Sequence, residues 1–309
     1  MKKSILLRLS PLLAIIAGCM WGSAGFFVRN LSSLGLDNIT ILECRVGIAV
    51  VIILIGILIY DKNLLKIKLK DSWCFLGTGL ISMVFFNYCY NAAINVTSLS
   101  LAAILLSTAP IFVIILSRII FNEKITKVKL KSLILAFIGC VLVSGIFGGE
   151  ASFSFKGILL GLASGFGYGL YSIFSRFAMN RGYNSLTINI YSFILAAIAC
   201  IFFTDFNLLG KLLIQSPLSI GGFLLLHALI LSVIPYILFT LSLKYIDTGR
   251  ASILASCEPI TATVLGIIIF KEIPSIISLI GIVLVLLALA LLSKPSENIV
   301  SITNKDELA

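Results

Sequence analysis

The chain has 309 residues, of which 60% are hydrophobic and only 12% are charged, and its mean hydropathy is +1.15. A composition this apolar excludes an ordinary soluble domain and indicates a polytopic membrane protein. The formal net charge of +10 does not indicate a nucleic-acid partner, because the Lys and Arg residues are spread among short linkers and form no basic arm.

Apolar stretches of about 19 to 25 residues suit helices that cross a hydrocarbon core about 30 Å thick. Ten such stretches can be marked: residues 10–29, 38–60, 73–95, 98–121, 130–148, 157–178, 185–204, 219–242, 250–270 and 275–293. The linkers between them are too short for a soluble domain. The sequence therefore predicts an all-α polytopic membrane protein with ten transmembrane helices.

The first stretch has a basic start and then an apolar run that includes Ile16-Ala17-Gly18-Cys19, which is similar to a bacterial lipoprotein cleavage site. The apolar run continues through Val28, so we expect an uncleaved first span. All seven Cys residues lie within or beside apolar stretches, without a C-x-x-C pair, and the only histidine is His227. We therefore expect no disulfide, no metal site and no cofactor.

Polar and aromatic side chains in three spans are candidates for the wall of an internal cavity. Asn87 and Asn91 in the third span are four residues apart and share a helix face with polar character, close to Tyr90. Aromatic walls could come from Trp21 in the first span and from Tyr168 and Tyr171 in the sixth. The alternatives are hydrogen bonding between helices for the Asn residues and ordinary packing for the aromatic rings.

Two ionisable residues lie inside other spans. Arg45 is about 10 Å inside the second span by the helical rise, and Glu43 two residues earlier faces away from it. We expect a structural tie between Arg45 and another helix. His227 in the eighth span is a candidate for relaying protons, with a simple hydrogen-bonding role as the alternative.

The most unusual residue is Glu258, followed by Pro259 at the centre of the ninth span. It lies about 13 Å from either end of the span, where insertion scales assign a charged residue a cost of about 2.5–3.5 kcal/mol. An acid at this depth is by default a functional site, so we expect Glu258 to recognise cargo or to couple transport to protons. The alternative is that it braces the kinked helix.

The fourth span repeats the ninth at an offset of 149 residues, with 11 identities in 22 positions between residues 102–123 and 251–272. The matched pairs are Ser107/Ser256, Pro110/Pro259 and Glu123/Glu272, while Glu258 matches Ala109. The prolines free the carbonyls of Leu106 and Ala255 beside the hydroxyls of Ser107, Thr108 and Ser256. Broken helices of this kind often bind the cargo of carriers, although kinks used only for packing remain an alternative. Glu123 and Glu272 close their spans, where structural capping or pairing between loops is expected.

The repeat extends to the first helix of each half. At an offset of 147 residues the matched pairs are Gly18/Gly165, Trp21/Tyr168, Gly22/Gly169 and Arg29/Arg176. These glycines let helix backbones pack closely within lipid, and moving contact between two halves is the alternative. The predicted units are a first five-helix repeat over residues 1–148, a second over 149–293, and a disordered tail over 294–309.

The basic residues set the predicted orientation. Of the 23 Lys and Arg residues, 18 fall on one side of the ten spans, one (Arg45) lies inside a span, and the other side has only Arg29, Lys156, Lys211 and Lys271. The excess marks the cytoplasmic side, which places both termini in the cytoplasm. Because each repeat has an odd number of spans, the second must be inverted relative to the first.

With ten spans, two inverted halves and a P-x12-E pattern closing the fourth and ninth spans, the sequence resembles the EamA branch of the drug/metabolite transporter superfamily. The matches are Arg45 with Ala49, Ser107 to Pro110 with Asn122-Glu123, and Glu258-Pro259 with Lys271-Glu272. The Gly that usually precedes the closing Glu is replaced by Asn122 and Lys271. The resemblance covers nearly the whole chain and implies a cell-membrane carrier, in many relatives an exporter of amino acids or other small metabolites.

The expected function is secondary transport by alternating access around a cavity at mid-depth. The expected partners are a small-molecule substrate, the lipid bilayer and protons, with the chain acting as a monomer or homodimer. A lipid or amphiphile flippase, or an accessory membrane subunit, is the alternative. An enzyme is not expected, because the sequence has no paired intramembrane aspartates, no G-x-S-x-G and no H-E-x-x-H.

Overall fold

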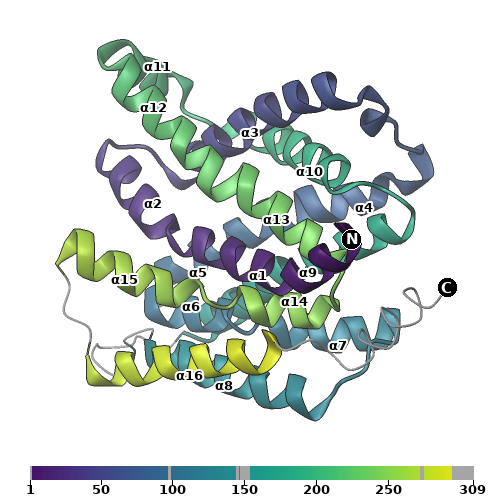
Figure 1. The fold of residues 1–309 in the computed structure, drawn as a ribbon. Coiled ribbons are helices and arrows are strands. Elements are labelled where there is room, and N and C mark those ends of the chain that lie inside the picture. The colour runs from purple at the N-terminus through teal and green to yellow at the C-terminus, as the bar shows by residue number, and fades with distance from the viewer. Residues whose placement is uncertain (1, 97–98, 144–145, 147–153, 272–274, 294–309) are drawn as a thin grey trace.

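The computed structural model describes residues 2–96, 99–143, 146, 154–271 and 275–293, and within them it contains helices and no strand (Figure 1). Eight helical stretches are long and apolar enough to cross a membrane: Leu9–Ser33, Asn38–Tyr60, Leu69–Val96, Leu101–Phe121, Phe155–Asn180, Ser185–Phe203, Pro217–Leu243 and Thr248–Ile269. Shorter helices, Lys127–Val143 and Ile276–Ser293, occupy the fifth and tenth predicted positions, and the second of them contains the apolar stretch Ile276–Leu292. The predicted tail over residues 294–309 and the predicted boundary at 148–149 lie outside the described residues.

The ten spans consist of the following helices, and several spans contain more than one helical segment. In the first repeat they are α1 (Lys2–Gly22) with α2 (Ala24–Ser33), α3 (Asn38–Tyr60), α4 (Ser72–Leu76) with η3 (Gly77–Phe85) and α5 (Phe86–Val96), α6 (Leu99–Leu106) with α7 (Ala109–Phe121), and α8 (Lys127–Val143). In the second repeat they are α9 (Phe155–Asn180), α10 (Ser185–Cys200), α12 (Pro217–Ala228) with η6 (Leu229–Val233) and α13 (Ile234–Leu243), α14 (Thr248–Ala255) with α15 (Glu258–Phe270), and α16 (Ile276–Ser293).

Polar caps outside the apolar runs fix where several of these helices begin. Asp37 accepts a hydrogen bond from the backbone N–H of Thr40 at 2.6 Å and starts α3. Asn184 accepts from the N–H of Leu186 at 3.0 Å and starts α10. Because lipid offers no replacement donor or acceptor, such caps belong at the ends of spans rather than within them.

The structure differs from the sequence-based expectation in two respects. The linker between the seventh and eighth spans contains another helix, α11 (Phe206–Gln215), whose apolar face packs beside the buried Leu36 and Leu224. In addition, the third and eighth spans, which are equivalent in the two repeats, each contain a π-helical segment, η3 and η6. Hydropathy identifies apolar stretches but does not report a change of hydrogen-bond register within a helix.

Packing between the repeats is reciprocal. The first helix of one repeat, α1, packs against α13, α14 and α15 of the other, and its equivalent, α9, packs against α5, α6 and α7. The remaining equivalent spans pair with each other, α3 with α10 and α8 with α16, the latter pair side by side at the bottom of Figure 1. Each repeat therefore contributes its first helix to the other, so that neither forms a separate domain.

Glycines permit the closest of these contacts. A methyl group added at Gly18 would collide with the carbonyl oxygen of Ala255, and one added at Gly22 with that of Glu258. In the other repeat, a Cβ at Gly165 would lie 2.7 Å from the carbonyl oxygen of Leu105, closer than real side chains approach. The two G-x-x-x-G patterns therefore place the backbones of α1 and α9 directly against the breaks in the ninth and fourth spans.

We expect Gly18→Ala and Gly165→Ala each to lower the melting temperature of the purified protein, because the added methyl group meets a backbone carbonyl rather than a movable side chain. Overpacking of this kind costs about 1–3 kcal/mol. The matched control is Gly56→Ala in α3, where nothing lies within 4 Å of the added carbon. Melting curves in detergent that are unchanged for Gly18→Ala would contradict the close approach.

Candidate functional site

A cavity of about 410 Å³ lies between the two repeats at the breaks in the fourth and ninth spans. Nine residues predicted to form a binding cavity line it: Trp21, Tyr90, Ser107, Pro110, Tyr168, Tyr171, Ser256, Glu258 and Pro259. Most of its lining comes from α1, α9, α13 and the four helices on either side of the two breaks. Sites for small molecules typically have volumes of about 300–1,000 Å³, so the cavity is large enough for a metabolite.

Glu258 is the first residue of α15 and directly follows the two-residue break after α14. The hydroxyl group of Tyr168 donates a hydrogen bond to Glu258 Oε1. The first turn of α15 also presents backbone N–H groups that favour a nearby negative charge. The equivalent first residue of α7 is Ala109, so the cavity is chemically asymmetric although its scaffold repeats.

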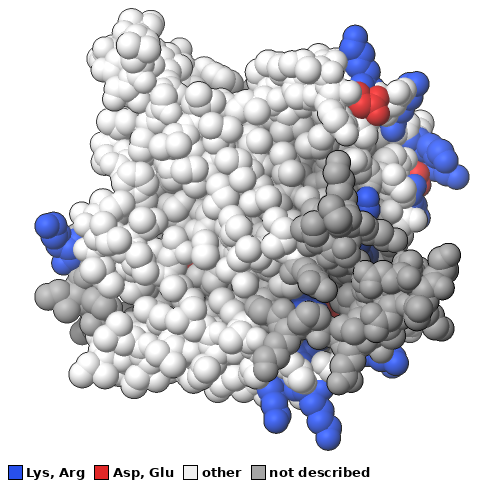
Figure 2. Space-filling model, viewed as in Figure 1, with Lys and Arg blue, Asp and Glu red and all other residues white. Residues whose placement is uncertain are grey.

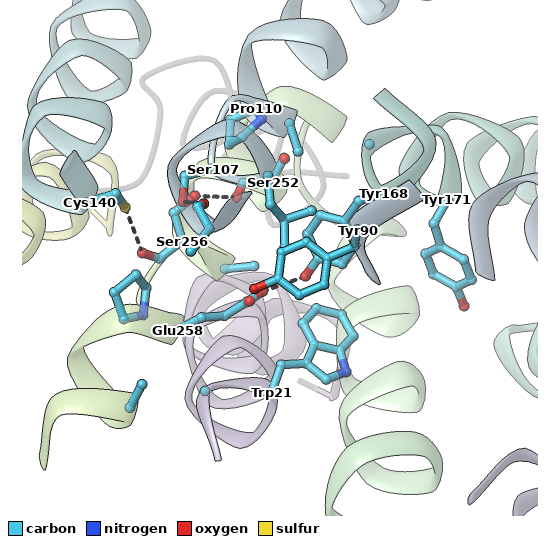
Figure 3. A pocket seen from close by; sticks show the side chains of 18 of the residues that line it. Trp21, Tyr90, Ser107, Pro110, Cys140, Tyr168, Tyr171, Ser252, Ser256 and Glu258 are labelled. Carbon is cyan, nitrogen blue, oxygen red and sulfur yellow. Dashed lines mark hydrogen bonds between the residues drawn. The ribbon is translucent and has the colours of Figure 1, made fainter. Parts of the chain in front are cut away.

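Aromatic rings surround this carboxyl group. Trp21 and Tyr168, which are equivalent in the two repeats, lie 6.1 Å apart between ring centroids in an edge-to-face arrangement. Figure 3 shows these two rings and Tyr90 gathered around Glu258. The ring centroid of Tyr236 lies 5.1 Å from that of Trp21. Tyr236 and Phe239 also line the cavity. Tyr236 and Phe239 were not among the residues predicted from the sequence, although the neighbouring Pro235 indicates a distortion in that span.

The serine hydroxyls beside the helix breaks already donate hydrogen bonds. Ser107 donates to the carbonyl of Ala103 at 2.9 Å, and Ser256 donates to the carbonyl of Ser252 at 3.2 Å. In the same wall the Cys140 thiol donates to the Ser256 carbonyl at 3.9 Å (Figure 3). The oxygen atoms of these hydroxyl groups are therefore left mainly as acceptors.

Three residues predicted to line the cavity lie outside its lining. The amide of Asn87 donates to the carbonyl of Met83 at 2.7 Å, so this side chain satisfies its own helix. Thr108 donates to the carbonyl of Leu105 at 2.6 Å and lies against Gly165 where the repeats meet. Asn91 is half-buried on α5 and is also not part of the lining. A spacing of four residues identifies a shared face, but the side-chain rotamer decides where that face directs its polar atoms.

Arg45 and His227 lie away from the cavity lining. Arg45 donates to the carbonyl of Leu231 at 3.4 Å, four residues before Pro235. The guanidinium group thus connects α3 to the π-helical segment of another span. His227 is fully buried and stacks on Phe27 with ring centroids 5.3 Å apart, and neither of its ring nitrogens has a hydrogen-bond partner among the described residues.

Glu123 joins the repeats one helical turn beyond the cavity. Its carboxylate accepts hydrogen bonds from the backbone N–H groups of Thr248 at 2.8 Å and Gly249 at 3.3 Å, which start α14. Lys129 lies 3.7 Å from the same carboxylate, and Arg176 donates to the Thr248 hydroxyl at 3.0 Å. Glu272, the equivalent of Glu123, lies outside the described residues.

Burial by itself would raise the pKa of Glu123, but the hydrogen bonds from Thr248 and Gly249 together with the Lys129 charge hold this pKa below its usual value. The carboxylate is therefore charged when it caps α14. Because it belongs to the linker after the fourth span and the capped helix starts the ninth, the contact fastens the two broken spans together at this end.

Comparison with known proteins places these features in a family. The sequence profile of the EamA-like transporter family matches residues 8–145 and again residues 155–294. An uncharacterized transporter of Archaeoglobus fulgidus is 27% identical over 277 residues, covering 86% of this chain and 90% of the relative. The uncharacterized transporter YyaM of Bacillus subtilis is 26% identical over 247 residues, covering 79% of this chain and 80% of the relative.

A solved crystal structure shares the fold, with a TM-score of 0.73 at 16% sequence identity. The match covers 91% of this chain and 95% of that one. At this identity the likeness concerns the arrangement of helices alone.

We expect Glu123→Gln to destabilise the protein by about 1–3 kcal/mol at neutral pH, because two backbone donors lose a charged acceptor. Since the folded protein lowers the pKa of Glu123 from about 4.5, this stabilisation is complete above that pH and disappears as the pH falls through the lower folded value. Melting temperatures of the two proteins should therefore converge in acid. The control is Asp61→Asn, because Asp61 lies in a linker and caps only the short helical turn that directly follows it. A constant difference across pH would contradict the charged cap.

Proposed function

The chain belongs to the EamA-like transporter family, and on that premise we propose that it is a secondary carrier that exports small polar metabolites by alternating access around the Glu258 cavity. Family membership makes it a multi-pass membrane transporter rather than an enzyme. The proposal adds the direction of transport, the class of cargo, with amino acids as one candidate group, and the residues that bind it.

One observation carries this proposal: among the described residues, a single carboxyl group lines a cavity at the junction of two inverted repeats, beside helices broken at equivalent positions. Burying a carboxyl group at this depth costs free energy, so such a residue is by default a functional site, and broken helices at a repeat interface are a common site for cargo in carriers. The compact volume of about 410 Å³ favours a small molecule over the acyl chains that a lipid flippase would have to accommodate.

The arrangement also supports alternating access. On one side of the cavity, Glu123 and α14 hold the fourth and ninth spans together. Because α1 and α9 pack reciprocally, the two ends of the cavity are built from equivalent contacts. A rotation of one repeat against the other would therefore close one end of the cavity and open the other. Contacts through glycines, which have no side chains to interlock, allow such a rotation with little steric cost.

The distribution of charge supports a plasma-membrane orientation with cytoplasmic termini. Figure 2 shows Lys and Arg side chains gathered mainly toward the side where α1 starts, with a broad uncharged surface across the middle and one group on the opposite side. In a bilayer the uncharged surface would contact lipid and the more basic side would face the cytoplasm.

We expect Glu258→Gln to keep the fold and to remove the pH dependence of transport, because the amide retains the shape of the side chain but cannot exchange a proton. Flux of a panel of amino acids and other small polar metabolites is measured in liposomes containing the purified protein, with and without a pH gradient. Melting curves verify folding. A well-folded Gln variant whose flux keeps the wild-type pH dependence would refute proton coupling through Glu258, and absence of protein-dependent flux for every cargo class would refute the carrier itself.

We expect a reporter fused after Lys294 to face the cytoplasm, because most Lys and Arg residues lie on the side assigned to the termini. The measurement uses paired fusions, one active only inside the cell and one active only outside. A fusion at Lys211, in the linker that carries α11, is the control and should report the opposite side. The same side for both positions would contradict the topology.

A further inference from the structure

We propose that the cavity selects a protonated amine: the cargo places an ammonium group on the Glu258 carboxylate and an apolar body against the surrounding rings. The inference rests on the proposed function only in treating this cavity as the place where cargo binds. It narrows that cargo to organic cations that carry no neighbouring carboxylate.

The first support is the supply of hydrogen-bond acceptors. Glu258 is the only acidic side chain among the described residues that line the cavity. Ser107 and Ser256 line it as well, and because their hydroxyl groups donate to their own helices, their oxygen atoms remain as acceptors. A carboxylate in the same cavity as two hydroxyl acceptors complements a group with several N–H donors, which an ammonium ion provides.

The second support is the shortage of donors. The hydroxyl of Tyr168 donates to Glu258, and that of Tyr171 donates to Asn189 at 2.5 Å. Thr263 donates to the carbonyl of Pro259 at 2.9 Å. Ser107 and Ser256 likewise donate to their own helices. A bound anion needs donors, and these five hydroxyl groups have already committed theirs; the indole N–H of Trp21 is a lining donor without a partner among the described residues.

The third support is the surrounding aromatic surface. Figure 3 shows Trp21, Tyr90 and Tyr168 gathered around the Glu258 carboxyl group. Ring faces attract cations, most strongly when water is excluded, and also accept an apolar body. Charge and packing therefore favour the same class of ligand, an amine attached to an apolar or aromatic group.

An α-amino acid fits this arrangement less well. It carries its carboxylate on the same carbon as its ammonium group, so binding the ammonium to Glu258 brings two negative charges together. Arg29 is the one basic residue among the described lining. The backbone of Gly22 lies against Glu258, and Arg29 follows Gly22 by seven residues, which is about 10 Å along a helix.

The chain offers a direct reporter of binding. It has two tryptophans, Trp21 in the cavity and Trp73 outside its lining, where Trp73 packs on Phe174 and Phe177. In a Trp73→Phe protein the fluorescence of Trp21 alone reports on the cavity. The probes are phenethylamine, its neutral counterpart phenethyl alcohol, phenylalanine, and sodium chloride without organic ligand.

We expect phenethylamine to change the Trp21 fluorescence in a saturable way, with phenethyl alcohol and phenylalanine each binding about tenfold more weakly or worse. Glu258→Gln should weaken phenethylamine binding by a similar factor and bring it level with the alcohol, while Tyr168→Phe should weaken it less. Glu43→Gln, which removes a buried carboxyl group outside the cavity lining, should leave binding unchanged. Melting curves of all variants establish that they fold.

Equal binding of phenethylamine and phenethyl alcohol would overturn the inference, and so would tighter binding of phenylalanine than of phenethylamine. A fluorescence response to sodium chloride that Glu258→Gln abolishes, with no response to phenethylamine, would overturn it as well. The liposome assay separates this failure from failure of the proposed function. Binding of phenethylamine without flux of any cargo class would contradict the carrier and uphold the amine site, whereas flux of carboxylate-bearing cargo alone would uphold the carrier and contradict the amine site.

Discussion

The close approach of two helix backbones to two helix breaks is the constraint on which the rest of this structure depends. Within lipid no hydrophobic effect draws helices together, so they associate where their surfaces fit. Gly18 and Gly22 let α1 lie against the break in the ninth span, and Gly165 and Gly169 do the same for α9 and the fourth span. Because each of these helices belongs to the opposite repeat, the contacts that build the centre of the protein also join its halves.

The prolines explain why this centre is polar although the spans are apolar. Pro110 and Pro259 each interrupt the helical hydrogen bonds in the middle of a span, and the residues around these two breaks line the cavity. In the eighth span, Arg45 of α3 donates to the carbonyl of Leu231, four residues before Pro235. Prolines within spans therefore lie in the cavity wall at two positions and beside a contact between helices at a third.

A symmetric scaffold carries an asymmetric site. The repeats match in their glycines, prolines and serines, yet the first residue after the break is Glu258 in one and Ala109 in the other. Trp21 and Tyr168 occupy equivalent positions on either side of this difference, and only the tyrosine provides the hydroxyl that bonds to the acid. The cavity therefore has a carboxyl group that only one repeat supplies, although residues of both repeats line it.

The sequence by itself determined the membrane class, the repeat and the unusual position of Glu258, because hydropathy, internal identity and a charge within an apolar run are all local properties. Nine of the residues selected from it line one cavity, since equivalent helix breaks meet where repeats pack. Only the tertiary structure decided that Asn87 and Thr108 turn to their own helices, that Tyr236 and Phe239 complete the wall, and that Glu123 caps α14 from the other repeat. Those outcomes depend on rotamers and on which helices become neighbours, and residues more than a hundred positions apart carry no local signal of their contact.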